Sequence, residues 1–129
     1  MGPTETDVAL ALAGTVPIGG KLFTGLTAHQ EIFEQAARDR KSETISISKK
    51  EVASITSNLL DQFSYIEHAE NVALALKVCE DLGVDRQKAL SAMQKANPDP
   101  GAMVVYELNF FGRQFYFVNG FAANDPEST

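Results

Sequence analysis

The chain has 129 residues, of which 44% are hydrophobic and 22% are charged, and its formal net charge is −6. This length and composition are those of one globular domain of ordinary size, and they exclude a wholly disordered protein. The negative charge argues against nonspecific nucleic-acid binding, because phosphates attract surfaces rich in Lys and Arg. The basic cluster of Arg38, Arg40 and Lys41 is interrupted by Asp39, which favours a solvated helix end.

The sequence predicts a soluble chain of a reducing compartment. The single cysteine, Cys79, has no partner for an internal disulfide, and its apolar surroundings favour a core thiol over a nucleophile. No apolar stretch approaches the ~20 residues that span a bilayer. The acidic Glu5 and Asp7 near the start differ from the positively charged region of a signal peptide.

The first part of the chain predicts a helix and a short strand. The helix is expected within residues 3–17. The Thr4 side chain can accept hydrogen bonds from the N–H groups of the first turn, and Gly14 and Pro17 end the helix. The run GGKLFTG at 19–25 is apolar between glycines and predicts a buried strand of about four residues.

Two capping boxes predict two further helices. Thr27 and Gln30 open the first, and Ser48 and Glu51 open the second. Their apolar residues recur at helical spacing: Ile32, Phe33, Ala36 and Ala37 in the first, and Val52, Ile55 and Leu59 in the second.

Strands alternate with these helices. The alternating ETISIS at 43–48 and the stretch QFSYIEH at 62–68 predict a second and a third strand. The order strand, helix, strand, helix, strand predicts parallel pairing through crossover helices. Three short strands make a thin sheet for a doubly wound fold.

Two helices and a hairpin complete the expected elements. Residues 68–82 are apolar nearly all round, with Gly83 as a left-handed cap. Asp85 caps the next helix. The prolines of NPDPG at 97–101 mark a domain boundary, and residues 103–121 predict a hairpin that turns near 111–113. The apolar stripe of the second helix comprises Ala89, Leu90, Met93 and Ala96.

The hairpin is expected to be apolar on both sides. Val104, Tyr106, Leu108 and Phe110 share a face of the first strand, and the second strand is aromatic on both faces. Such strands are normally buried on both sides. With no later segment in the chain to cover it, we expect the hairpin to self-associate, to exchange with a neighbour or to stay partly ordered.

The common catalytic motifs are absent, and the two histidines lack metal-ligand spacing, so no metal site is predicted. His29 is expected on an exposed first helical turn. For His68, capping or packing is favoured over a ligand role. Asn71 lies in the first turn of an apolar helix, where a buried amide needs partners, and helix capping is favoured over ligand contact.

The polar stretch NGFAANDPEST at 119–129 follows a strand. Asn119, Asn124 and Asp125 lie just past its carboxyl end, where open α/β sheets bind ligands. An Asx turn explains these residues equally well.

Four stretches together resemble one family: MGPT at 1–4, HAENVALALKVCEDLGVDRQKAL at 68–90, ANPDPGAM at 96–103 and FVNGFAANDPEST at 117–129. They are similar to the catalytic ligase subunit of poly-γ-glutamate (capsule) synthase, a Mur-ligase-like ATP-dependent acid–amino acid ligase. The resemblance runs nearly end to end.

The resemblance implies an α/β fold in an internal fragment of a longer enzyme. Residues 1–97 would be the C-terminal part of a Mur-ligase-like central ATPase domain, with short parallel strands and helices. Residues 98–129 would be an inter-domain joint and the first hairpin of a Rossmann-like C-terminal ligase domain.

The resemblance also implies site residues. Asn71, with His68 at the start of the same helix, would lie beside the nucleotide base. Gly101 and Ala102 stand where Mur enzymes usually carry an Arg that touches nucleotide, so that contact is not implied here. The joint would comprise Pro98, Asp99, Pro100 and Gly101, and the loop facing nucleotide and incoming amino acid would include Asn119, Asn124, Asp125 and Ser128.

The implied reaction uses MgATP to phosphorylate a γ-carboxylate, and the amine of the next glutamate then attacks the acyl phosphate. The phosphate- and metal-binding residues would lie outside this chain, which is expected to be inactive alone and to hold no catalytic residue. Implied partners are glutamate or poly-γ-glutamate and membrane-bound synthase subunits, at the cytoplasmic side of a bacterial membrane. The alternatives are a stand-alone binding or assembly module, and a small α/β domain with incidental similarity.

Overall fold

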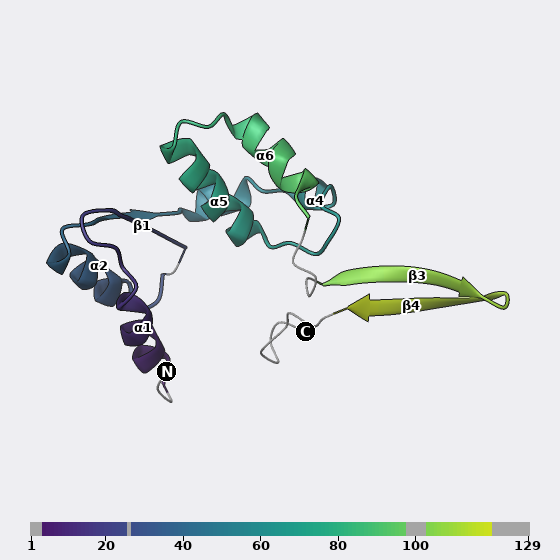
Figure 1. The fold of residues 1–129 in the computed structure, drawn as a ribbon, viewed down its shortest axis with the longest axis horizontal. Helices are drawn as coiled ribbons and strands as arrows, with labels where there is room; N and C mark the ends of the chain where they lie inside the picture. Colours follow the sequence, from purple (N-terminus) through teal and green to yellow (C-terminus); the bar gives the residue numbers. More distant parts are fainter. Residues whose placement is uncertain (1–3, 26, 98–102, 120–129) are drawn as a thin grey trace.

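The computed structural model describes residues 4–25, 27–97 and 103–119. Helices and strands are mixed along the chain, and Figure 1 shows the terminal hairpin projecting away from the helices. The elements are α1 (Glu5–Ala13), β1 (Lys21–Thr24), α2 (Gln30–Asp39), β2 (Glu43–Ser46), α3 (Lys49–Ala53), α4 (Ser57–Leu60), α5 (Ala69–Asp81), α6 (Arg86–Lys95), β3 (Val104–Phe110) and β4 (Arg113–Asn119).

The predicted parallel pairing is confirmed for two strands. β1 and β2 pair in parallel with Lys21 opposite Glu43, and α2 forms the crossover between them. The third strand predicted at 62–68 is wrong, because this segment forms turns and bends. Phe63 of this segment is buried in the core. The N–H of Ile66 donates to the Met103 carbonyl at 3.0 Å.

The described residues bury two apolar cores. The larger lies among α3, α4, α5 and α6, and the smaller lies between α1 and α2. The predicted apolar face of α2 is confirmed, because Phe33 and Ala37 are buried there. Helix α5 contacts β1, α3 and α6, which accounts for its apolar residues on several sides. The larger core comprises Ile55, Phe63, Val72, Ala73, Leu76, Ala89 and Leu90; the smaller comprises Ala9, Ala13, Val16, Phe33 and Ala37.

Local capping predictions hold at three helix starts. Thr4 and Ser48 each form a reciprocal capping box, with Asp7 and Glu51 respectively. Asp85 accepts a hydrogen bond from the N–H of Lys88 at 3.0 Å. These bonds satisfy first-turn donors that have no partner within the helix.

The capping box predicted for Thr27 and Gln30 is wrong. The N-cap is His29, which has a left-handed φ of 56° and makes no side-chain cap hydrogen bond. The Gln30 side chain donates to Glu34 instead, at 2.7 Å. His29 is half-buried beside α1, so its predicted place on an exposed turn is also corrected.

The helix predicted after Ser48 is interrupted. Helix α3 ends at Ala53, and α4 begins at Ser57. The Ser54 hydroxyl donates to the Glu51 carbonyl at 2.6 Å, a local bond that competes with helix continuation. Ile55 in the interruption is buried in the larger core.

Arg40 is not the solvated residue that its basic neighbours suggested. Its Nη1 lies 2.7 to 2.9 Å from the carbonyl oxygens of Ala13, Gly14 and Val16, at the end of α1. A cation stabilises this negative end of a helix, and its N–H groups satisfy carbonyls that lack intrahelical partners. Arg40 thereby ties α2 to α1.

The hairpin lies where the sequence predicts it, but the expected distribution of apolar side chains on its two faces needs correction. Strands β3 and β4 pair antiparallel, with Phe111 and Gly112 in the turn at positive φ values of 50° and 72°. The register confirms that β4 has aromatic residues on both faces, because Phe115 and Phe117 lie on one face and Tyr116 lies on the other. The second face is mixed and not wholly apolar, because it also carries the polar residues Glu107, Asn109 and Gln114.

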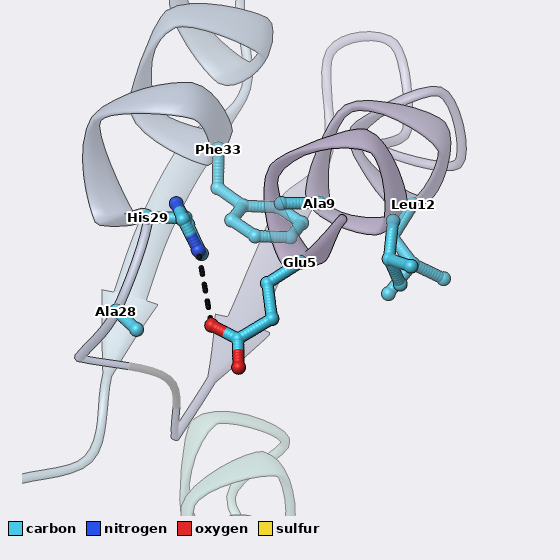
Figure 2. Close-up of a pocket in the computed structure, with 7 residues that line it drawn as sticks. Glu5, Ala9, Leu12, Ala28, His29 and Phe33 are labelled. Atoms are coloured by element: carbon cyan, nitrogen blue, oxygen red, sulfur yellow. Dashed lines mark ion pairs between the residues drawn. The ribbon is translucent and has the colours of Figure 1, made fainter. Parts of the chain in front are cut away.

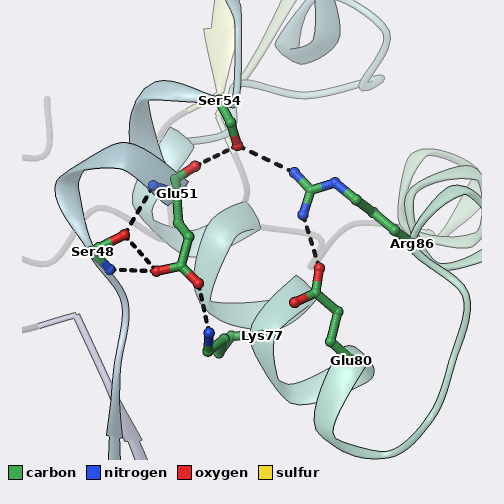
Figure 3. A network of polar contacts seen from close by, with 6 residues as sticks. All are labelled: Ser48, Glu51, Ser54, Lys77, Glu80 and Arg86. Carbon is green, nitrogen blue, oxygen red and sulfur yellow. Dashed lines mark hydrogen bonds and ion pairs between the residues drawn. The ribbon is translucent and has the colours of Figure 1, made fainter.

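A salt-bridged cluster joins α3 to α5 and α6 (Figure 3). Glu51 Oε1 lies 2.6 Å from Lys77 Nζ, and its other oxygen accepts from the N–H and hydroxyl of Ser48. Arg86 bridges Glu80 and Ser54 at 3.1 and 3.3 Å. The hydrogen bond from Lys77, with those from Ser48, lowers the pKa of Glu51 from 4.5 to about 2.

Helices α2 and α5 are each followed by a residue in the left-handed conformation, which is a lysine after α2 and a glycine after α5. In α5 the left-handed position is Gly83, at φ 74°, as predicted. In α2 it is Lys41, at φ 54°. The next N–H closes each motif: Val84 donates to Cys79 at 2.9 Å, and Ser42 donates to Ala37 at 2.8 Å.

Exchanging these end residues should change stability in opposite directions. Lys41→Gly should raise the free energy of unfolding by about 0.5–1 kcal/mol, because glycine adopts positive φ without steric cost. Gly83→Ala should lower it by about 1 kcal/mol for the opposite reason. A Cβ at Gly83 meets no atom within 4 Å, so packing does not contribute. Urea denaturation measures both, and changes of the same sign would contradict the argument.

Glu51 should make stability depend on acid. Its folded pKa lies below the unfolded value, so its contribution is complete above pH 4.5 and is lost as the pH falls toward about 2. The difference in unfolding free energy between the unsubstituted chain and Glu51→Gln should therefore shrink over that interval. Glu31→Gln, an exposed change on α2, is the control. A difference that stays constant with pH would refute this assignment.

Candidate functional site

A pocket of about 260 Å³ lies between the 62–68 segment, the start of α5 and the end of α6. Its walls are mostly apolar side chains, and its polar groups come from a tyrosine, a carboxylate and an amide. The lining residues are Phe63, Tyr65, Glu67, Asn71, Val72, Ala75, Met93 and Ala96.

The aromatic wall is anchored in the larger core. Phe63 is buried, and the half-buried Tyr65 meets it edge to face, with ring centroids 5.8 Å apart. Burial raises the pKa of the Tyr65 hydroxyl, and the neighbouring Glu67 carboxylate raises it further. At neutral pH Tyr65 is therefore a neutral hydroxyl that can donate or accept a hydrogen bond.

Glu67 organises the polar wall. Its Oε1 accepts from the backbone N–H of His68 at 2.8 Å and from Asn71 Nδ2 at 3.0 Å. The carboxylate thus serves the N-cap residue of α5 and orients the amide one turn later. Sequence reasoning missed Glu67, which precedes the N-cap of α5 and lies four residues before Asn71.

The expected roles of His68 and Asn71 need correction. His68 is the N-cap of α5, but its exposed side chain makes no cap hydrogen bond and does not line the pocket. Asn71 is exposed and not a buried amide. Its second amide N–H and its carbonyl oxygen have no partner among the described residues, so both can meet a ligand.

This arrangement suits a flat ligand with polar edges. Apolar walls cover ring faces, while a few placed polar groups fix orientation. A side-chain amide offers a donor and an acceptor side by side, the pair that recognises an adenine edge.

Of the other predicted site residues, one lies in the hairpin and the rest lie outside the described part of the chain. Asn119 ends β4 opposite Val104, at the base of the hairpin. That base follows Met103, whose carbonyl binds Ile66 of the segment that walls the pocket. The joint and the remaining loop residues lie outside the described part of the chain: Pro98, Asp99, Pro100, Gly101, Asn124, Asp125 and Ser128.

A second, more apolar pocket of about 470 Å³ lies between α1 and the start of α2 (Figure 2). His29 and Glu5 stand beside it with Nε2 and Oε2 3.7 Å apart, and Phe33 and Leu12 are among its lining residues. This pair offers two polar groups to a wide apolar groove, fewer than the first pocket has.

Metal-binding clusters and membrane-spanning helices are both absent from the described residues. No group of three or more His, Cys, Asp or Glu residues there could hold a metal ion. No helix in those ranges is long and apolar enough to cross a membrane. Cys79 is half-buried against the larger core, in agreement with its predicted packing role.

Comparison with known proteins relates the whole chain to two bacterial sequences. It is 39% identical over 129 residues to the capsule biosynthesis protein CapB of Bacillus anthracis, and 39% identical to the PGA synthase CapB of Bacillus subtilis (strain 168). The match covers 100% of this chain but 27% and 32% of those relatives. No protein-family model matches the chain, and no solved structure matches it. The chain is thus similar, along its full length, to about a third or less of proteins named for capsule and PGA synthesis.

Proposed function

We propose that the chain is part of an ATP-dependent acid–amino acid ligase that joins glutamates through γ-amide bonds in poly-γ-glutamate synthesis. The observation that carries the proposal is the 39% identity along all 129 residues to relatives named for capsule and PGA synthesis. In this proposal, residues 1–97 complete a Mur-ligase-like ATPase domain and residues 98–129 begin a Rossmann-like ligase domain.

Amide formation needs an activated carboxyl group. A glutamate γ-carboxylate attacks the γ-phosphorus of ATP and releases ADP, which gives an acyl phosphate. The amine of the next glutamate then attacks the carbonyl carbon, phosphate leaves, and the amine loses a proton. Cations and N–H groups must stabilise the transferring phosphoryl group. In this proposal, the residues that bind the phosphates and the metal lie in other parts of the enzyme.

The role proposed for this chain is to seat the nucleotide base at the Asn71 pocket. The free donor and acceptor of the Asn71 amide would pair with an adenine edge, and Glu67 holds that amide in place. Apolar side chains such as Val72 and Met93 would cover the ring. His68, beside the pocket at the start of α5, is a proposed second contact.

The remaining roles follow from the resemblance. The loop with Asn119, Asn124, Asp125 and Ser128 would face nucleotide and incoming amino acid, and 98–101 would be the joint between domains. Glutamate or poly-γ-glutamate, membrane-bound synthase subunits and a place at the cytoplasmic side of a bacterial membrane are parts of the same proposal.

A chimaera tests the ligase assignment. The matching segment of the B. subtilis relative is replaced by these 129 residues, and glutamate-dependent ATP consumption and polymer formation are measured. We expect activity, and we expect Asn71→Ala to lower kcat/KM for ATP by about 10-fold, the loss of one well-placed hydrogen bond. Asn58→Ala, a change of an exposed asparagine on α4, is the matched control. A folded but inactive chimaera would favour the non-catalytic module.

Nucleotide titration of the chain alone tests the base pocket. Adenosine should shift the NMR signals of the Asn71 side-chain amide and of Ala75 and Met93, and Asn71→Ala should weaken these shifts. MgATP should bind no more tightly than adenosine, because the phosphate-binding groups are expected elsewhere in the enzyme. Binding of MgATP more than about 10-fold tighter, a gain of about 1.4 kcal/mol, would place a phosphate site within this chain.

A further inference from the structure

Glu67 holds the Asn71 amide in one of its two possible orientations. Glu67 Oε1 lies 3.0 Å from Asn71 Nδ2. A carboxylate only accepts hydrogen bonds, whereas an amide has a donor group and an acceptor oxygen that exchange places when the amide turns over. The turned-over amide would put its oxygen against the carboxylate, where two acceptors repel each other. The amino group of Asn71 therefore faces Glu67, which leaves Oδ1 and the second N–H for a ligand.

Glu67 is itself held by the backbone and by the pocket wall. Its Oε1 also accepts from the N–H of His68 at 2.8 Å, at the N-cap of α5. The half-buried Glu67 side chain lines the pocket together with Phe63 and Tyr65. One carboxylate thus connects the orientation of the Asn71 amide to the backbone at the start of α5.

The order of acceptor and donor on the free edge of this amide distinguishes purine bases. Adenine has an amino donor, N6, beside a ring-nitrogen acceptor. Hypoxanthine and guanine, here called the oxopurines, have an acceptor oxygen in place of that amino group. Oδ1 of Asn71 accepts from the adenine amino group but repels an oxygen at the same place. An amide that turns over freely would present its N–H to the oxopurine oxygen, whereas a fixed amide does not.

We infer that Glu67 is a positioning residue that makes the Asn71 pocket selective for adenine over the oxopurines. The inference rests on the proposed function, in which this pocket seats a nucleotide base. Glu67 acts through Asn71 and need not touch the base. Selectivity follows because an oxopurine would leave both its own oxygen and Oδ1 of Asn71 without a donor, and unpaired polar groups in a site cost binding energy.

Titration of the 129-residue chain with adenosine and with inosine tests this selectivity. Inosine is the suitable probe because its base is hypoxanthine and its sugar is the same. The unsubstituted chain should bind adenosine at least about 5-fold more tightly, the low end of discrimination by an amide pair. Glu67→Gln should reduce this ratio at least about 3-fold, because glutamine both donates and accepts and so permits both amide orientations. The NMR signals of Ala75 and Met93, which line the pocket, report binding.

The ratio separates positioning from a purely structural role, which would weaken both nucleosides equally. Glu70→Gln is the matched control: it makes the same change of charge at an exposed first-turn residue of α5 outside the pocket lining. It should leave the ratio within about 2-fold. An unchanged ratio in Glu67→Gln, or equal affinities in the unsubstituted chain, would overturn the selectivity and leave the base pocket standing. Binding of neither nucleoside would overturn the base pocket as well.

The ligand-free chain tests the fixed amide without any nucleoside. Side-chain nitrogen relaxation measures the picosecond-to-nanosecond motion of each asparagine amide. In the unsubstituted chain the Asn71 amide should be more ordered than that of Asn58, an exposed asparagine on α4. Glu67→Ala should make the two amides equally mobile. Equal mobility already in the unsubstituted chain would show that Glu67 does not fix Asn71 and would refute the inference.

Discussion

Burial of α5 is the interaction on which the packing of α3, α4 and α6 around the larger core depends. Leu76 is 1% exposed, and Val72 and Ala73 are buried beside it. Full burial of a valine or leucine side chain such as Val72 or Leu76 contributes about 1.5–3 kcal/mol. The ion pairs around α5, Lys77 with Glu51 and Lys21 with Asp81, are partly exposed, so solvent screens them and they stabilise the structure less than the buried side chains do. Apolar packing therefore contributes more than the ion pairs to the position of α5.

The elements that sequence reasoning predicted correctly depend on neighbouring residues. The Ser48–Glu51 box and the Gly83 end involve groups within five positions of each other, so their chemistry is visible in the sequence. The incorrect predictions concern contacts between residues that lie far apart in the sequence. A strand at 62–68 needs a partner backbone, and the chain offers it helices instead. Arg40 caps a helix whose end lies at least 24 residues away, which its charged neighbours could not reveal.

The candidate site likewise combines local features that the sequence shows with tertiary contacts that it does not show. Asn71 was identified through family resemblance, and its position at the start of a helix is correct, but the pocket around it is tertiary. Met93 and Phe63 meet there across 30 positions of sequence because α6 folds back on α5. The spacing of Glu67 and Asn71 was visible, yet the same spacing occurs in Glu34 and Gln30 on an ordinary exposed helix face. What distinguishes Glu67 is the apolar wall beside it.

The 62–68 segment contacts both the pocket and the start of the hairpin. Tyr65 and Glu67 of this segment line the pocket. The N–H of Ile66, which lies between them in sequence, donates to the Met103 carbonyl at 3.0 Å, one residue before β3 begins. The segment that the sequence predicts as a third strand therefore does not extend the parallel sheet; it joins one wall of the pocket to the start of the hairpin.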